Sequence, residues 1–216
     1  MKIYKISTCI KLIFLSFILF IANSLPLLAK DPLLKEAAKY DKYSKPNFNR
    51  EKAVNLYKQY AEKKTTDDYK KIQVYHRIAQ LYSYAAGPGN KDSAKAIEYY
   101  NHLLQIAGDR IVEDVMYARS NLTSIGKKNH EERLIANIQF YTWIIQALLD
   151  PGLEQKILFP SDIKESEKKD YTEGVIDSLL SFRESEAKTI KGLANNVKPI
   201  FYSAPRATCL NRPETL

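Results

Sequence analysis

Apolar residues recur along most of the chain at alternating intervals of three and four positions. This spacing places their side chains on one face of an α-helix, whereas a half-buried strand would alternate with a period of two. No segment of comparable length shows the period of two. The apolar series are Ile72-Tyr75-Ala79-Tyr82-Ala86, Ala96-Tyr100-Leu103-Ala107, Ile111-Val115-Ala118-Leu122-Ile125 and Leu134-Ile138-Tyr141-Ile145-Leu148. The pattern predicts an all-α fold.

Residues with specific conformational roles mark the ends of these helices. Asp31 precedes Pro32, which suits a helix start because the amide hydrogen that proline lacks would be unpaired there. The Gly-Pro-Gly-Asn segment at 87–90 predicts a turn. Two capping-box spacings occur, at Asn129-Glu132 and Asp170-Glu173. We expect helices at 31–43, 49–64, 67–86, 91–107, 110–126, 129–149 and 167–195.

An internal repeat underlies the first six of these helices. The pattern Ala53-Val54-x-x-Tyr57-x-x-Tyr60 recurs as Ala96-Ile97-x-x-Tyr100-x-x-Leu103, and more loosely as Ala136-x-x-x-Phe140-x-x-Trp143. A small residue lets two helices approach closely, and the aromatic residue one turn later fills the gap to the next pair. Such a pair buries its apolar face only by stacking on its neighbours.

The clearest copy resembles a tetratricopeptide repeat (TPR). Tyr75-x-x-Ile78-Ala79-x-x-Tyr82 is similar to the first helix of that repeat, and Ala96-Ile97-Glu98-Tyr99-Tyr100 is similar to the second. The turn between them is longer than in the usual unit. In this respect the segment resembles the Sel1-like subclass, with Gly87-x-Gly89, Asp92, Lys95-Ala96, Tyr100 and a close at Gly108. The resemblance is strong over 72–108 and weak elsewhere.

The resemblance implies a short right-handed α-solenoid of about three helix hairpins, followed by a long C-terminal helix. It also implies that the first helices line a concave face that binds a peptide or a partner protein. The residues expected on that face are Gln73, His76, Arg77, Gln80 and Tyr84. An ordinary solvated helix face is the alternative for this set. The residues expected to pack the repeats together are Ala53, Tyr57, Tyr75, Ala79, Tyr82, Ala96 and Tyr100.

The chain begins with a segment that has the features of a signal peptide. Lys2, Lys5 and Lys11 precede an apolar stretch that runs to Ile21, and small residues suited to cleavage follow. An uncleaved membrane anchor is the alternative, because the apolar stretch approaches the length that spans a bilayer. The expected organisation is a leader at 1–29, repeats at 30–149, a linker at 150–166, a C-terminal helical segment at 167–198 and an irregular tail at 199–216. We expect an exported protein, periplasmic or secreted.

Charge and cysteine content restrict the possible functions. Without the leader the chain keeps 30 basic and 25 acidic residues, a net charge of +5. This excess is spread along the helices, whereas a nucleic-acid-binding protein concentrates its positive charge on one face. We therefore expect no nucleic-acid partner. Cys209 is the one cysteine beyond the leader, so no intramolecular disulfide is available there.

Residues that could carry catalysis or bind a metal are few. His76, His102 and His130 lack the spacing of metal ligands and are interpreted as polar residues on helix surfaces. No nucleophile elbow, phosphate loop or zinc-protease motif occurs. We expect no cofactor, no metal and no enzymatic activity. The leading hypothesis is a protein-interaction scaffold or adaptor. The alternatives are a structural subunit of a cell-envelope complex without a free groove and an unrecognised hydrolase.

Overall fold

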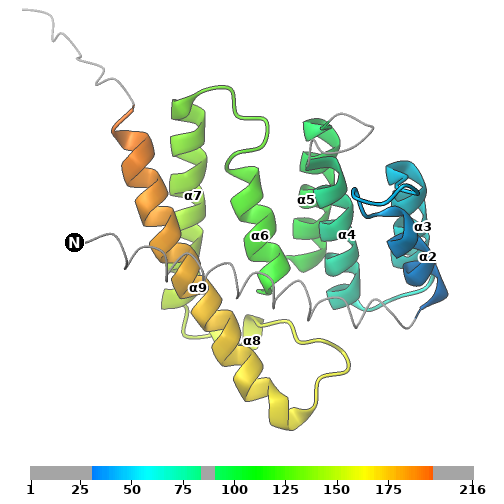
Figure 1. The fold of residues 1–216 in the computed structure, drawn as a ribbon. Helices are drawn as coiled ribbons and strands as arrows, with labels where there is room; N and C mark the ends of the chain where they lie inside the picture. The colour runs from blue at the N-terminus through cyan, green and yellow to red at the C-terminus, as the bar shows by residue number, and fades with distance from the viewer. Residues whose placement is uncertain (1–30, 84–90, 197–216) are drawn as a thin grey trace, which may run out of the picture.

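A computed structural model describes residues 31–83 and 91–196, and within these ranges the fold is all-α (Figure 1). One isolated parallel bridge, between Ile111 and Ile157, is the only strand-like pairing of these ranges. The helices are α2 (Pro32–Tyr40), α3 (Arg50–Lys63), α4 (Asp68–Ser83), α5 (Ser93–Ala107), α6 (Glu113–Leu122), α7 (His130–Leu149), α8 (Leu153–Lys156) and α9 (Glu165–Ala194). The predicted fold class is confirmed.

The helix ends fall within a few residues of the predicted positions, and most of the predicted caps form. The amide of Leu33 donates to Oδ1 of Asp31 at 2.7 Å. The amide of Glu132 donates to Oδ1 of Asn129 at 2.8 Å. The predicted cap at Asp170 is wrong, because α9 begins at Glu165 and Asp170 lies inside it.

The segment predicted to be a linker, 150–166, contains more structure than expected. It includes α8, and it pairs by its backbone with the residue that precedes α6. The amide of Ile111 donates to the carbonyl of Lys156 at 2.8 Å, and the amide of Leu158 donates to the carbonyl of Ile111 at 3.0 Å. These hydrogen bonds hold the segment between α8 and α9 against the residue that precedes α6.

Several predicted features lie outside the described residues. They are the leader at 1–29, Tyr84, the turn at 87–90 and the tail at 199–216. Within the described ranges, no helix combines the length and the apolar character needed to cross a membrane.

Helices that are neighbours in the sequence are neighbours in space. α2 packs on α3, and α4 packs on α5. Each pair contacts the next one, α3 against α4 and α5 against α6, and α4 also contacts α6. The third predicted pair differs from the others, because α7 packs mainly against α9, which crosses α7 (Figure 1) and also contacts α6. The row of helix pairs thus ends in a unit built from α6, α7 and α9.

The residues predicted to pack the repeats are all buried. They belong to one apolar core that extends from α2 to α6 and includes Ala53, Tyr57, Tyr75, Ala79, Tyr82, Ala96 and Tyr100. A second core joins α6 to α7, α8 and α9. α6 contributes to both, with Val115 and Ala118 in the first core and Met116 in the second, where Ile111, just before α6, joins it.

The buried face of α7 differs from the predicted one. The structure buries Asn137, Phe140, Ile144 and Ala147, whereas Ile138 of the predicted stripe is 45% exposed. No charged residue occurs between positions 134 and 149. Apolar residues therefore occur on more than one face of α7, and the sequence pattern alone does not select the face that is buried.

Candidate functional site: a polar chain along α4

The helix α4 is the most enclosed helix of the described ranges. Nine of its residues are buried, and none of its sixteen is fully exposed. The residues that remain half-buried include Gln73, Arg77 and Gln80, spaced four and three positions apart. They therefore share one face of the helix. This is the face that the sequence predicts for partner binding.

Arg77 lies on this face but is engaged within the protein. Its Nε donates to Oδ2 of Asp41 at 2.9 Å, and one terminal nitrogen donates to the backbone carbonyl of Asp41 at 3.1 Å. Its other terminal nitrogen donates to the side-chain carbonyl of Gln80 at 3.2 Å. The Asp41 carboxylate is buried in the turn after α2. Arg77 thus joins the first helix pair to α4.

The hydroxyl of Tyr57 on α3 completes the environment of Asp41. It donates to Oδ2 of Asp41 at 2.6 Å. Burial, together with the neighbouring carboxylate, raises the pKa of Tyr57 well above its usual range, so the phenol keeps its proton. Burial alone would lower the pKa of Arg77, but the Asp41 charge and hydrogen bond raise it. Arg77 and Tyr57 therefore satisfy the buried carboxylate with donors of fixed protonation state.

His76 is buried, at 7% exposure, which corrects its interpretation as a surface histidine. Its Nδ1 pairs with Oδ1 of Asp114 on α6. Its Nε2 lies 3.2 Å from the side-chain amide nitrogen of Gln80. The ring of Tyr117 stacks near it, with centroids 6.1 Å apart. The burial escapes local analysis because Asp114 is 38 residues away in the sequence.

The other two histidines lie elsewhere. His102 on α5 is partly buried and meets the ring of Tyr75 edge-on, with centroids 4.4 Å apart. His130 begins α7 and is exposed, as predicted. No group of three or more potential metal ligands gathers anywhere in the described ranges.

The contacts around α4 form one continuous hydrogen-bonded series, which we name the polar chain. It runs from the first helix pair, through α4, to the third pair. Its members in order are Tyr57, Asp41, Arg77, Gln80, His76 and Asp114. Three helix pairs are thereby held in register by side chains of a single helix.

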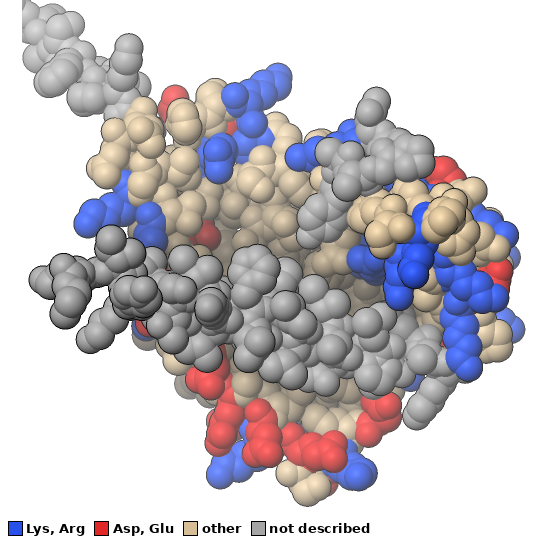
Figure 2. Space-filling model, viewed as in Figure 1, with Lys and Arg blue, Asp and Glu red and all other residues tan. Residues whose placement is uncertain are grey.

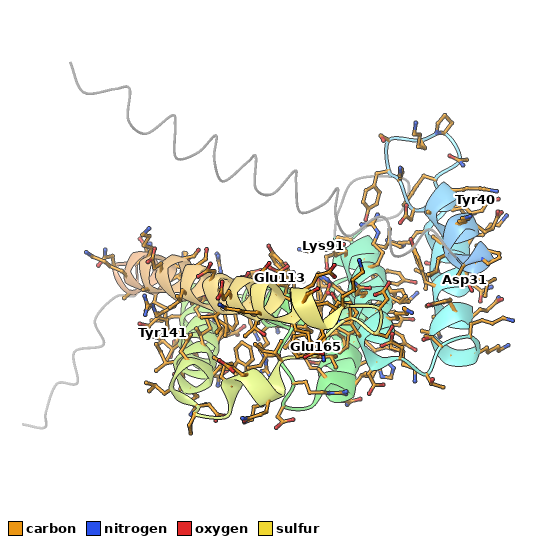
Figure 3. The ribbon with its side chains drawn as sticks, turned by 90° about the horizontal axis from the view of Figure 1, so that it is seen from below. Asp31, Tyr40, Lys91, Glu113, Tyr141 and Glu165 are labelled. Carbon is orange, nitrogen blue, oxygen red and sulfur yellow. The ribbon has the colours of Figure 1, made fainter. Side chains whose placement is uncertain are left out.

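The polar chain continues toward α9 through the residue beside Asp114. Glu113 lies at the start of α6, next to α9 in the view from below (Figure 3). The hydroxyl of Ser178 on α9 donates to its Oε1 at 2.7 Å. Burial raises the pKa of Glu113, and this hydrogen bond opposes the rise. The first turn of α6 therefore joins α4 to α9.

The side-chain groups of this face that could contact a partner are mainly amides. Gln73 has no hydrogen-bond partner among the residues that the structure describes, and Gln80 is shared between Arg77 and His76. An amide donates and accepts, so it can pair with either group of a peptide backbone. The guanidinium of Arg77, in contrast, already has acceptors on three of its nitrogens.

The α4 members of the polar chain could be predicted from the sequence, but their partners could not. Asp41 follows α2 without a recognisable motif, and Asp114 stands in the first turn of α6, where an acidic residue is common for helix-dipole reasons. Only the tertiary arrangement brings both carboxylates to α4.

Charge on the molecular surface is unevenly distributed. Figure 2 shows Lys and Arg side chains gathered at the α2–α3 end and Asp and Glu side chains along the edge where α9 begins. No family model, curated protein sequence or solved structure matches this chain.

Proposed function

We propose that the protein is an exported protein-interaction adaptor of the TPR or Sel1-like kind. In this proposal the helix pairs form a right-handed solenoid, and its first helices bind a segment of another protein. The supporting observation is the polar chain along α4. It fixes the half-buried amide of Gln80, and the half-buried Gln73 lies on the same face of α4.

Fixed side chains favour binding because fewer rotamers are lost when the partner docks. Immobilising a flexible side chain at an interface costs roughly 0.5–1.5 kcal/mol, and a chain of internal hydrogen bonds removes part of that cost in advance. Gln80 is held from both sides, by Arg77 and His76. A polar, extended peptide segment suits this face better than an apolar helix.

The role proposed for Arg77 changes accordingly. A direct bidentate pair with a partner carboxylate would require Arg77 to leave the buried Asp41. That carboxylate would then lose its cationic partner, which is costly for a buried charge. We therefore assign Arg77 a positioning role and assign contact with the partner to Gln73 and Gln80.

A two-stage experiment tests the adaptor function. Partners that copurify with the protein from its native compartment are identified by mass spectrometry, and the purified partner is then titrated against variants. Gln73→Ala/Gln80→Ala should weaken its affinity by about tenfold, equivalent to ~1.4 kcal/mol. The matched control is Gln59→Ala/Gln105→Ala on α3 and α5. Equal affinities of the two double variants would reject this face as the binding surface.

Export is a separate part of the proposal and has its own test. The Lys-rich, apolar leader predicts cleavage after one of the small residues near its end. N-terminal sequencing of the protein from cells should give Leu25 or Lys30 as the first residue. An intact Met1 in a membrane-integrated form would favour the anchor instead.

The internal engagement of this face supports a second candidate, a structural subunit of an envelope complex. The side chains of Arg77 and His76 bond to residues of this chain, Arg77 to Asp41 and His76 to Asp114 and Gln80. Neither is directed toward an open groove. In that case copurification would return stoichiometric subunits whose binding is insensitive to Gln73→Ala/Gln80→Ala. The same titration therefore discriminates between the two candidates.

A further inference from the structure

The outer face of α7 carries a row of exposed apolar side chains. Ile135, Ile138 and Leu149 are 51%, 45% and 77% exposed, and they are the exposed large apolar residues of the described ranges. With Thr142 and the half-buried Ile145 they are spaced by three, four, three and four positions. This is the spacing of a helix that packs against another helix. The buried residues of α7, Phe140 and its neighbours, lie on the opposite face.

The row is suited to burial because few of its groups would lose hydrogen bonds to water on burial. No charged residue occurs from position 134 to 149. Thr142 is the polar residue at the centre of the row, and its hydroxyl donates to the carbonyl of Ile138 at 2.9 Å. Its hydrogen is therefore already paired, and the methyl group can enter an apolar interface without an unsatisfied donor.

The spacing of the row is nearly symmetric about Thr142. Ile135 and Leu149 lie seven positions before and after it, and Ile138 and Ile145 lie four before and three after. Two copies of α7 packed antiparallel with Thr142 at their two-fold axis would place Ile135 of one against Leu149 of the other. In a two-fold interface every residue of the row occurs twice, so a charge in the row would bring a second like charge into the same apolar contact. The uncharged row avoids this.

The apolar area that two copies of α7 would bury limits the strength of their association. Burying an Ile or Leu side chain is worth ~1.5–3 kcal/mol at ~25 cal/mol per Å², or roughly 60–120 Å² per side chain. Five positions, some already half-buried, then contribute roughly 300–400 Å² per copy. Stable dimers bury about 800 Å² per partner. The contact is therefore expected to be weak and to require a protein concentration of tens of micromolar or more.

We propose that the outer face of α7 is a self-association surface, on which a second copy of this chain packs antiparallel through Ile135, Ile138, Thr142, Ile145 and Leu149. This surface lies at the end of the helix row and is separate from the polar chain on α4. Dimerisation would place two α4 faces in one assembly.

Sedimentation velocity of the protein as the cell produces it, over a range of concentrations, tests this proposal. Wild type should shift from monomer toward dimer as its concentration rises. Ile138→Glu/Leu149→Glu should raise the dimer dissociation constant at least tenfold, since four carboxylates would enter one interface. Ala94→Glu, which adds a charge on an exposed position of α5, should leave the dimer unchanged.

A cross-linking variant tests the geometry without disturbing the apolar contacts. Thr142→Cys, in a Cys9→Ser/Cys209→Ser background, should form an interchain disulfide on oxidation, because a residue on the axis meets itself. Ser185→Cys on an exposed position of α9 should not.

Three results would overturn the proposal. The first is a wild type that stays monomeric at several hundred micromolar, and the second is a dimer that survives Ile138→Glu/Leu149→Glu. The third is wild-type binding to lipid vesicles that those substitutions abolish while the protein remains monomeric, which would assign the row to a membrane surface. Far-ultraviolet circular dichroism verifies that each variant keeps its helices.

Discussion

Glu186 provides the sharpest test of the structure, because it is a buried carboxyl group with an unpartnered oxygen. It lies on the face of α9 that carries Val175, Leu179 and Leu193, and it is only 5% exposed. Its Oε1 has no hydrogen-bond partner, and Glu186 forms no ion pair within the described ranges. Burial raises its pKa from 4.5 to about 7.

This shift makes the stability of the fold depend on pH. The folded chain holds the Glu186 proton more tightly than the unfolded chain does. The contribution of Glu186 to stability is therefore complete below pH 4.5 and is lost as pH rises toward 7. One pKa unit corresponds to ~1.4 kcal/mol, and between about pH 5 and pH 8 the ionisation of Glu186 should therefore lower the free energy of unfolding by roughly 2–3 kcal/mol. Ionisation would weaken the packing of α9.

Urea unfolding followed by far-ultraviolet circular dichroism measures this contribution. Glu186→Gln removes the titration but keeps the shape of the side chain. The difference in unfolding free energy between this variant and wild type should grow by roughly 2–3 kcal/mol in favour of the variant between about pH 5 and pH 8. Glu184→Gln, at an exposed position of the same helix, should show no such growth. A difference for Glu186→Gln that does not change with pH would refute the buried, unpartnered carboxyl.

Further substitutions test the packing of the repeats. Asp41→Ala should lower the unfolding free energy by roughly 2–3 kcal/mol in urea titrations, less than the 3–5 typical of a fully buried ion pair because its arginine partner is partly exposed. Ala96→Leu, at a fully buried position, should destabilise by ~1–3 kcal/mol through overpacking, whereas Ala94→Leu at the surface should not; equal melting temperatures would contradict the packing. Gly108 has φ 62° and ψ −121°, outside the left-handed region that L-residues can adopt, so Gly108→Ala should destabilise by at least ~1–3 kcal/mol. Gly126 has φ 75°, and its added Cβ would also lie 3.0 Å from Cδ1 of Ile97, so Gly126→Ala should destabilise as well; calorimetry that shows no loss at either position would contradict these backbone conformations.

The parts of the fold that sequence could predict are those that depend on local spacing. Ala53 and Tyr57, like Ala96 and Tyr100, repeat the small-then-aromatic pattern of close helix pairs, and all four are buried. Caps at Asp31 and elsewhere depend on residues one turn apart, so helix starts were also predictable.

The parts that sequence could not predict depend on contacts between distant segments. His76 has a partner on α6, and Arg77 has one in the turn after α2; neither partner is marked by a motif. Glu186 stands among charged residues of α9 and resembles a solvated position until α7 and α9 are packed together. For α7 itself the missing information was which of several apolar faces is covered. That choice was made by α9, more than fifteen residues further along the chain.

α6 lies between two apolar cores and so divides the molecule into two units. One of these units should be able to unfold while the other stays folded. Val115 and Ala118 belong to the core around α4, and Ile111 and Met116 belong to the core around α7 and α9. Loss of α9 would therefore expose mainly the second core and remove Tyr171 from the edge of the first, while the buried residues around α4 would keep their packing. Amide hydrogens of α9 should exchange with solvent through such a partial opening, whereas those of α4 should exchange only when the whole chain unfolds. α6 is thus the boundary at which partial unfolding of this protein should stop.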